Sequence, residues 1–344
     1  MSPYDPRIHP YLIDESEFYE IEEAAQQKEF LLRYAVLAPS AHNAQPWAFR
    51  VTDDGAEVYA DYSRRVPVAD PHDRELMLSI GAAIANLRIA AAHFGFDTTV
   101  LYTPAVHAKD PDWPVAMVTF RETCDPDPAL RALFAAIPKR HTNRAAFDER
   151  ELEADVLGRL CEVVDGSDEI RFVLPQERTH AAELIEEADR RLLANPQWRH
   201  ELAQWVRTND TPAADGICGD AFGIPGPLSA FAPWLVRSFD VGDVRGRTDR
   251  TLATNAAGLL VIMSDEDRQS LLRAGETLER LLLTLTNLGV QYAFLNQPIQ
   301  VPELRRELWK LVRTPKPPQL LLRIGYAVPI RRPAPRRRVS TVTV

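Results

Sequence analysis

The chain of 344 residues has few cysteines and no long apolar run. Its three cysteines, Cys124, Cys161 and Cys218, are odd in number and widely spaced, which argues for a reducing compartment and against a disulfide framework or a structural zinc site. No apolar run approaches the roughly 20 residues of a membrane span, and the first residues lack the basic and then apolar layout of a signal peptide. We therefore expect a cytoplasmic protein with no membrane partner and no bound metal.

Several motifs of catalysis and nucleotide binding are also missing. The sequence contains no GxGxxG, P-loop, GxSxG or HExxH pattern, so Rossmann-type dinucleotide folds, nucleotide triphosphatases, serine hydrolases and zinc proteases lose support. The net charge of −9 argues against a nucleic-acid partner. The remaining composition is that of an ordinary globular protein, with length enough for two modest domains or one large one.

One polar loop, residues 38–47, carries an informative set of groups. Ser40, Asn43 and Gln45 place one hydroxyl and two primary amides within six residues, and two prolines restrict the backbone around them. A primary amide presents a donor and an acceptor in one plane. This pattern suits the edge of a planar heterocycle that carries C=O and N–H groups side by side. His42 lies in the same loop, where a lone histidine is more often structural or exposed than catalytic.

A helix–strand pattern occurs twice, in residues 80–104 and 274–298. Two glycines and one proline recur with a shift of 194 residues, at Gly81/Gly275, Gly95/Gly289 and Pro104/Pro298. Apolar residues in both segments follow the 4-3-4-3 spacing of a helix with one buried stripe, and the second glycine of each falls where a left-handed C-cap residue closes a helix. The pattern favours a duplicated unit and a pseudo-two-fold pair of half-domains; two unrelated amphipathic helices are the alternative.

The remaining segments predict an α+β architecture in which helices cover central antiparallel or mixed sheets. We expect helices over Glu17–Leu37 (with Ser16 as N-cap), 80–94, Glu151–Val164, Glu177–Leu193, 274–288 and Pro302–Val312. We expect strands over Ala48–Thr52, Glu57–Asp61, Thr99–Tyr102, Val115–Arg121, Ile170–Leu174, Leu259–Met263 and Gln319–Ile324.

A basic cluster opens the second half of the chain. Arg140 and Arg144 stand four residues apart with the hydroxyl of Thr142 between them, so that all three can converge on one anion such as a phosphate monoester. The alternative is a surface basic loop. No comparable arginine cluster precedes the first long helix of the chain, where three acidic residues lie instead.

These two stretches resemble the signatures of the nitroreductase family of FMN-binding proteins. Residues 38–47 match its APSxxNxQPW string, and residues 140–147 are similar to its Arg-Arg-Ser-x-Arg-x-Phe phosphate motif. His141 replaces an arginine, Thr142 replaces the serine, and Phe147 falls one residue late. Since each half carries only one signature, the resemblance implies the fused, Acg-like subgroup: a nitroreductase-like half-domain over 1–135 and another over 136–344, joined as an intramolecular pseudo-dimer with one FMN site.

The resemblance also assigns residues to that site. It implies ring contacts from Pro39, Ser40, Asn43 and Gln45, and phosphate contacts from Arg140, Thr142 and Arg144. It places the segment after the second repeat helix near the flavin N5 position, which makes Asn296 and Gln297 candidates. Near the C-terminus it adds Arg323, Arg336 and Arg338, for which a solvated basic tail is the alternative.

Residues 207–240 differ in character from the rest of the chain. Glycines and prolines are mixed with Phe222, Phe231 and Trp234, which excludes a long helix or strand. Long apolar loops in compact proteins are usually functional. We expect a lid over the flavin here, with a dimerisation arm as the alternative.

The resemblance implies an FMN-dependent oxidoreductase that passes hydride from NAD(P)H to a small acceptor such as a nitroaromatic or a quinone. The absence of an obvious acid–base side chain fits, because the cofactor carries the hydride. The alternative is a storage or sequestration protein that holds FMN under a closed lid. A third possibility, a relative that has lost flavin, is disfavoured by the intact ring signature. A monomer would suffice for a complete site, and a homodimer is not excluded.

Overall fold

The computed structural model describes residues 5–104, 110, 112–163, 169–329 and 332–344. A first sheet contains the antiparallel strands β1 (Trp47–Thr52), β2 (Gly55–Ala60), β4 (Ala116–Glu122) and β3 (Phe96–Tyr102), in that spatial order. The helices α2 (Ala24–Ala35) and α3 (Arg74–His93) pack with it in one hydrophobic core.

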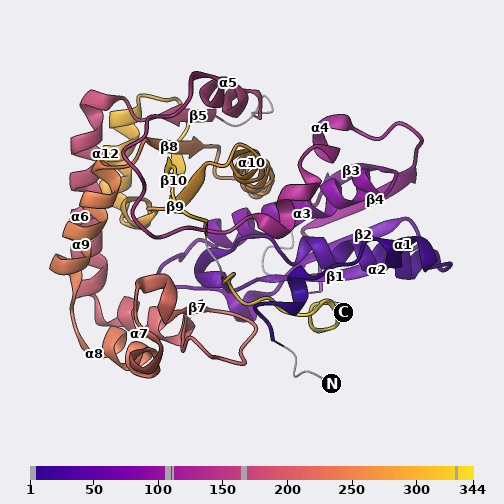
Figure 1. Cartoon of the computed structure of the whole chain (residues 1–344), viewed down its shortest axis with the longest axis horizontal. Coiled ribbons are helices and arrows are strands. Elements are labelled where there is room, and N and C mark those ends of the chain that lie inside the picture. The colour runs from indigo at the N-terminus through magenta and orange to yellow at the C-terminus, as the bar shows by residue number, and fades with distance from the viewer. Residues whose placement is uncertain (1–4, 105–109, 111, 164–168, 330–331) are drawn as a thin grey trace.

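A second sheet contains β5 (Glu169–Phe172), β8 (Gly258–Met263), β10 (Pro318–Gly325) and β9 (Gln291–Phe294), also antiparallel. It lies between α10 (Arg268–Asn287) on one face and α6 (Arg178–Ala194), α9 (Gly242–Thr254) and α12 (Pro302–Val312) on the other (Figure 1). Successive residues of β8 alternate between the two cores: Leu260 and Ile262 join the α10 side, whereas Leu259 and Val261 join the α6 side. This is the period of two expected for a strand that is covered on both faces.

The two sheets share one topology, with strands in the order first, second, fourth, third and a 20-residue helix between the second and third strands. The two long helices, α3 and α10, cross at a pair of glycines. A Cβ on Gly81 would lie 2.0 Å from the Leu272 carbonyl oxygen, and a Cβ on Gly275 would lie 2.2 Å from the Leu78 carbonyl oxygen. Because the contact is reciprocal, the halves meet as an isologous pair does, which confirms the predicted intramolecular pseudo-dimer.

The repeat pattern also predicted the ends of these helices. Gly95 and Gly289 have φ of 89° and 69°. Each lies two residues beyond the last residue of its helix, α3 or α10. Left-handed backbone of this kind is the conformation of a glycine C-cap. The repeat pattern placed the starts of both helices too late, however: α3 begins at Arg74 rather than near Ile80, and α10 begins at Arg268 rather than near Ala274.

Two other boundaries differ from expectation. The predicted helix Glu17–Leu37 is two helices, α1 (Ser16–Glu20) and α2. Ile21 is extended between them, with ψ of 115°, and its carbonyl accepts a hydrogen bond from the Gln27 side chain. Ser16 is a helical residue and not the N-cap. The predicted helix Glu151–Val164 is α5 (Ala154–Glu162), and Val164 lies outside the described residues.

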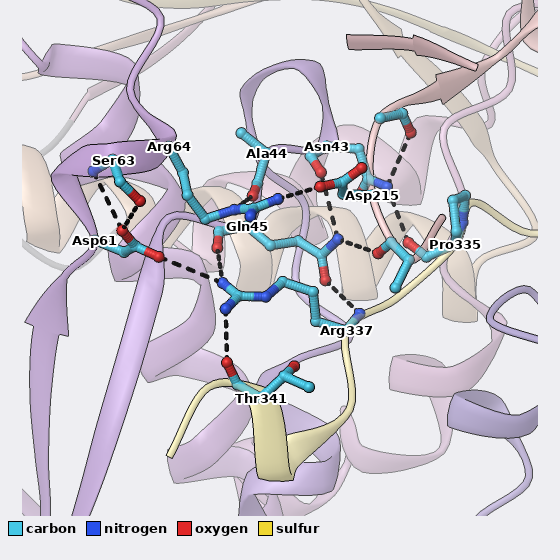
Figure 2. A network of polar contacts seen from close by, with 12 residues as sticks. Asn43, Ala44, Gln45, Asp61, Ser63, Arg64, Asp215, Pro335, Arg337 and Thr341 are labelled. Carbon is cyan, nitrogen blue, oxygen red and sulfur yellow. Dashed lines mark hydrogen bonds and ion pairs between the residues drawn. The ribbon is translucent and has the colours of Figure 1, made fainter. Parts of the chain in front are cut away.

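The segment before β8 contains more regular structure than the sequence predicted. It includes α7 (Pro196–Trp205), a short parallel pair β6 (Val206–Arg207) and β7 (Ile217–Cys218), α8 (Ala232–Ser238) and α9. The shorter helices are α4 (Pro128–Arg131) and α11 (Gln297–Gln300). The C-terminal tail crosses to the first sheet, where Phe49 and Val342 to Val344 exchange backbone hydrogen bonds at the edge of β1. The tail and the 207–240 segment therefore both lie beside the loop that precedes β1 (Figures 1 and 2).

By length and composition α3 could cross a membrane, contrary to the expectation that the chain has no such segment. In the structure 89% of its apolar window is buried within the protein. Both sides of the helix pack on protein, which is the pattern of a core helix.

Candidate functional site

Two cavities that share lining residues lie where residues 38–47, residues 140–147 and the 207–240 segment meet. Cavity 1 has a volume of about 350 Å³ and cavity 2 of about 280 Å³. Residues common to both linings are Pro39, Ser40, Arg144, Ile217 and Phe294. The two predicted signatures, about a hundred residues apart in the chain, thus come together at one place.

The signature loop has a strained backbone. His42, Asn43 and Gln45 have φ of 52°, 56° and 54°, in the left-handed region that non-glycine residues seldom adopt. The Ser40 hydroxyl accepts a hydrogen bond of 2.8 Å from the Gln45 backbone nitrogen and helps to hold the turn. Strain of this kind tends to gather at ligand-binding sites, where the surrounding structure enforces it.

The two amides of this loop bind other parts of the chain (Figure 2). Asn43 Nδ2 donates to the carbonyl oxygens of Gly216 at 3.0 Å and Pro335 at 2.9 Å. Gln45 Nε2 donates to the Ala214 carbonyl at 2.8 Å, and Gln45 Oε1 accepts from the Arg337 backbone nitrogen at 2.8 Å. Asn43 still lines cavity 1, whereas Gln45 is fully buried and lies outside both linings. A ring contact for either side chain stays a prediction.

An aspartate from the 207–240 segment completes this network. Asp215 accepts from Arg207 Nη2 at 2.8 Å and from Arg64, whose Nε donates to the Ala44 carbonyl at 2.5 Å. Burial alone would raise the pKa of the Asp215 carboxyl, but hydrogen bonds from Arg207 and Arg64 lower it below its usual value. Signature loop, 207–240 segment and tail are therefore joined by charge-assisted contacts.

The predicted phosphate cluster lines cavity 1 through Arg140, Thr142 and Arg144. Arg140 is almost fully buried and is also a structural residue: it donates to the Tyr292 hydroxyl at 2.7 Å and the Leu37 carbonyl at 2.9 Å, and its Nε lies 3.2 Å from Glu279 Oε1. His141 also lines the cavity, but burial and then Arg140 lower its pKa to about 3, so it adds no charge.

Arg144 lies at the junction of the two cavities. Within the described part of the chain its guanidinium has no hydrogen-bond or ion-pair partner. Burial, followed by the nearby Arg245, lowers the pKa of Arg144 to about 10. A cation that lines a cavity and lacks a protein partner can bind an anion there.

The three C-terminal candidates have different positions. Arg336 is buried and lines cavity 1, where its Nη1 donates to Asn43 Oδ1 at 2.7 Å. Arg323 lies in the buried strand β10, donates to the Ala145 carbonyl at 2.8 Å and stacks on Phe147 at 4.0 Å, outside both linings. Arg338 is exposed and lines neither cavity. Arg336 therefore joins the cluster, and contacts of Arg323 or Arg338 with a ligand stay predictions.

Asn296 and Gln297 line cavity 2. Asn296 Oδ1 accepts from the Leu321 backbone nitrogen at 2.9 Å, and Gln297 Nε2 donates to Asp249 Oδ2 at 2.9 Å. Gln297 Oε1 is buried with no hydrogen-bond partner among the described residues. His42 lines the same cavity, and burial lowers its pKa, so that it is neutral.

One further arginine at the site carries no signal in the sequence. Arg7 is 3% exposed, lines cavity 1 and pairs with Asp220 at 2.9 Å. Its Nε donates to the Pro333 carbonyl at 2.7 Å, which joins the N-terminal segment to the tail. Arg7 stands outside both signatures, and no spacing in the sequence connects it with them.

No family model matches the chain. The Mycobacterium tuberculosis protein named "Putative NAD(P)H nitroreductase Rv3131" is 29% identical over 330 residues, covering 92% of this chain and 91% of that protein. The uncharacterised protein Rv3127 of the same organism is 30% identical over 330 residues, with coverages of 91% and 92%. The protein named "Putative NAD(P)H nitroreductase acg" is 27% identical over 319 residues, with coverages of 90% and 93%.

Among solved structures, the FMN-dependent nitroreductase NfnB from Mycobacterium smegmatis in complex with NADPH is 13% identical and has a TM-score of 0.39, covering 63% of this chain and 97% of that one. The curated relatives match nearly the full length of the chain. The chain belongs to the nitroreductase family, in the company of the Acg-type proteins.

Proposed function

We propose that the chain is an FMN-dependent NAD(P)H oxidoreductase with one flavin site per polypeptide. The observation that carries the proposal is Arg144, whose guanidinium lines both cavities and has no hydrogen-bond or ion-pair partner among the described residues. Five arginines line cavity 1 against one carboxylate, that of Asp220. Such an excess of guanidinium groups suits a dianionic phosphate, and relatives named as NAD(P)H nitroreductases support the assignment.

The residues present fit FMN. Arg140, Thr142, Arg144 and Arg336 would hold the phosphate end in cavity 1, and the ring would extend towards cavity 2, past Pro39 and Ser40 and beside Asn296. When bound, the flavin supplies two-electron hydride transfer between NAD(P)H and an acceptor. The protein orients both molecules, excludes water with the 207–240 segment and offers cations to negative charge that develops in the site.

Replacing Arg144 with alanine is expected to weaken FMN binding by roughly 10- to 100-fold, because a charge-assisted contact contributes about 1.5–3 kcal/mol. FMN fluorescence during titration of the flavin-free protein measures the affinity. Arg338→Ala is the matched control, since Arg338 is exposed and lines neither cavity. An unchanged affinity in Arg144→Ala would refute the phosphate assignment.

A storage protein that holds FMN without turning it over is a second candidate. It is favoured by the contacts of Asn43, Gln45 and Asp215, which hold residues 207–240 against the signature loop (Figure 2). Anaerobic addition of NADPH or NADH to the yellow protein separates the two. Fast bleaching of the flavin band supports the reductase, and bleaching by dithionite alone supports storage.

Asp215→Asn is expected to loosen the 207–240 segment, because the carboxylate that joins Arg64 to Arg207 loses its charge. Trypsin should then cleave near Arg207 several-fold faster, and FMN should dissociate faster. Since the pKa of Asp215 is lowered, the contact should persist at neutral pH and be lost only as the pH falls through that lowered value. Asp210→Asn, at an 87% exposed side chain, should leave both rates unchanged; equal rates in the two variants would contradict this role.

We further infer that the functional division lies near residues 135 and 136, that 207–240 acts as a lid and that the two halves arose by tandem duplication. A monomer is sufficient in this scheme, since one chain supplies both signatures. The three free cysteines favour a cytoplasmic location.

A further inference from the structure

Cavity 2 combines an apolar wall with one polar end. Trp198 and Leu202 of α7 and Phe222, Val236 and Val241 of the following segment form the wall. Asp189 of α6, Arg245 of α9 and Gln297 of α11 form the polar end. A flat, apolar molecule with a polar edge suits this shape.

Two carboxyl groups with different partners meet at this end, that of Asp189 in the lining and that of Asp249, which is outside the lining. Asp249 is fully buried and is bound by Arg245 through two contacts of 2.9 Å and by Gln297 Nε2 at 2.9 Å. These three donors stabilise the Asp249 carboxylate. Asp189 is 3% exposed, and its Oδ2 has no hydrogen-bond partner among the described residues.

Two effects keep the proton on Asp189. Burial and then the neighbouring Asp249 raise the pKa of Asp189 to about 8. Arg245 and then a side-chain hydrogen bond with Gln297 oppose them, whereas a side-chain hydrogen bond with Asp249 favours the protonated form. The other titratable or charged groups that face the cavity are His42, Glu75 and Arg144. Asp189 is therefore a neutral carboxylic acid at pH 7, with an O–H group to donate.

We propose that cavity 2 is the acceptor site, that it takes a flat, apolar acceptor such as a quinone, and that the Asp189 carboxyl is the proton donor of the reaction. The inference rests on the proposed reductase function. NAD(P)H is the reductant and supplies the hydride by way of the cofactor. The hydride brings the quinone two electrons and one proton. The second proton comes from Asp189, whose O–H bond breaks as the proton moves to a quinone oxygen. The product is a hydroquinone, and Asp189 regains a proton from water.

One proton besides the hydride completes the reduction, whether a quinone becomes a hydroquinone or a nitro group becomes a nitroso group and water. The cavity offers one neutral carboxyl group, which matches this requirement. His42 is neutral and supplies no further proton. The apolar wall suits the flat ring of such an acceptor.

The test compares wild type with Asp189→Asn in separate half-reactions. Stopped-flow bleaching by NADPH should be unchanged in Asp189→Asn, whereas reoxidation by a soluble benzoquinone should slow by roughly 100-fold, as for loss of a general acid. Wild-type reoxidation should fall as the pH rises through about 8, and Asp189→Asn should show no such fall. Asp189→Glu should recover part of the rate. Asp155→Asn, at an exposed side chain in α5, is the control.

Two readouts do not depend on turnover. Infrared difference spectra should contain a protonated carboxyl band that disappears in Asp189→Asn, and benzoquinone should quench Trp198 fluorescence with the same affinity in both proteins. Wild-type reoxidation rates in Asp189→Asn, or no saturable quenching of Trp198, would overturn the inference. If NADPH fails to bleach the flavin, the proposed reductase function is refuted and not this inference. The quenching titration and the infrared band would then still decide whether cavity 2 takes a quinone beside a neutral Asp189.

Discussion

Replacement of Arg140 by alanine is expected to lower the free energy of unfolding at pH 8 by about 3–5 kcal/mol, the usual cost of removing one partner of a buried ion pair. Arg140 and Glu279 are 2% and 0% exposed in their side chains, and their Nε and Oε1 atoms lie 3.2 Å apart. Without Arg140, the Glu279 carboxylate loses its ion-pair partner and keeps only the weaker effects of Arg336 and Asn86. Urea unfolding measures the effect.

The loss should depend on pH, with a definite sign. Burial raises the pKa of Glu279 to about 7, and Arg140 opposes that rise. The pKa of Glu279 is thus higher in the folded state than in the unfolded state. Stability therefore falls as the pH rises from the unfolded pKa to the folded one, because over this range only the unfolded chain has released the proton. In Arg140→Ala the folded pKa is higher still, so the decline should continue above pH 7 with a slope of up to about 1.4 kcal/mol per pH unit.

The double variant Arg140→Ala/Glu279→Gln is the control for this pair. It should remove the extra pH dependence and regain part of the stability, because the unpaired Glu279 carboxylate is gone. Equal slopes in the single and double variants would show that Glu279 is not the group that Arg140 balances. For this reason Arg144, and not Arg140, is the informative position for FMN binding.

Gly81→Ala is expected to destabilise the chain by about 3 kcal/mol or more, at the upper end of overpacking effects. The new Cβ would lie 2.0 Å from the Leu272 carbonyl oxygen and 2.9 Å from Gly275 Cα, and both are backbone atoms that no side-chain rotation can move away. α3 and α10 would have to separate along the line where the two halves meet. The better helix propensity of alanine, worth about 1 kcal/mol, cannot offset this.

Gly158→Ala in α5 is the matched control, because a Cβ there meets no atom within 4 Å. It should be neutral or stabilising by up to about 1 kcal/mol. Gly275→Ala should behave like Gly81→Ala, and the double variant should lose less than the sum, since the first separation makes room for the second methyl group. Thermal and urea unfolding of all four proteins decide the matter. Additive losses would mean that the two glycines do not share one crossing.

Local patterns in the sequence predicted much of the architecture. The spacing of apolar residues and the positions of Gly95 and Gly289 predicted both long helices and their ends, because helix periodicity and left-handed caps are local properties. The break at Ile21, the start of α3 at Arg74 and the helices α7 and α9 were missed. Their apolar residues pack on partners distant in the chain, and no local spacing reveals such partners.

The candidate site, like the fold, was predictable from the sequence only in part. The residue types in 38–47 and 140–147 were sufficient to predict that an anion and a polar ring share one cavity, and Pro39, Ser40, Asn43, Arg140, Thr142 and Arg144 do line it. Which group each side chain meets was not predictable: Asn43 and Gln45 bind residues 214–216 and the tail, Arg140 balances Glu279, and Arg7 enters from outside both signatures. Short stretches of sequence determine which kinds of chemical group a site contains. Hydrogen-bond partners, burial and shifted pKa values arise only when distant segments fold against one another and displace water, as they do around Asp189.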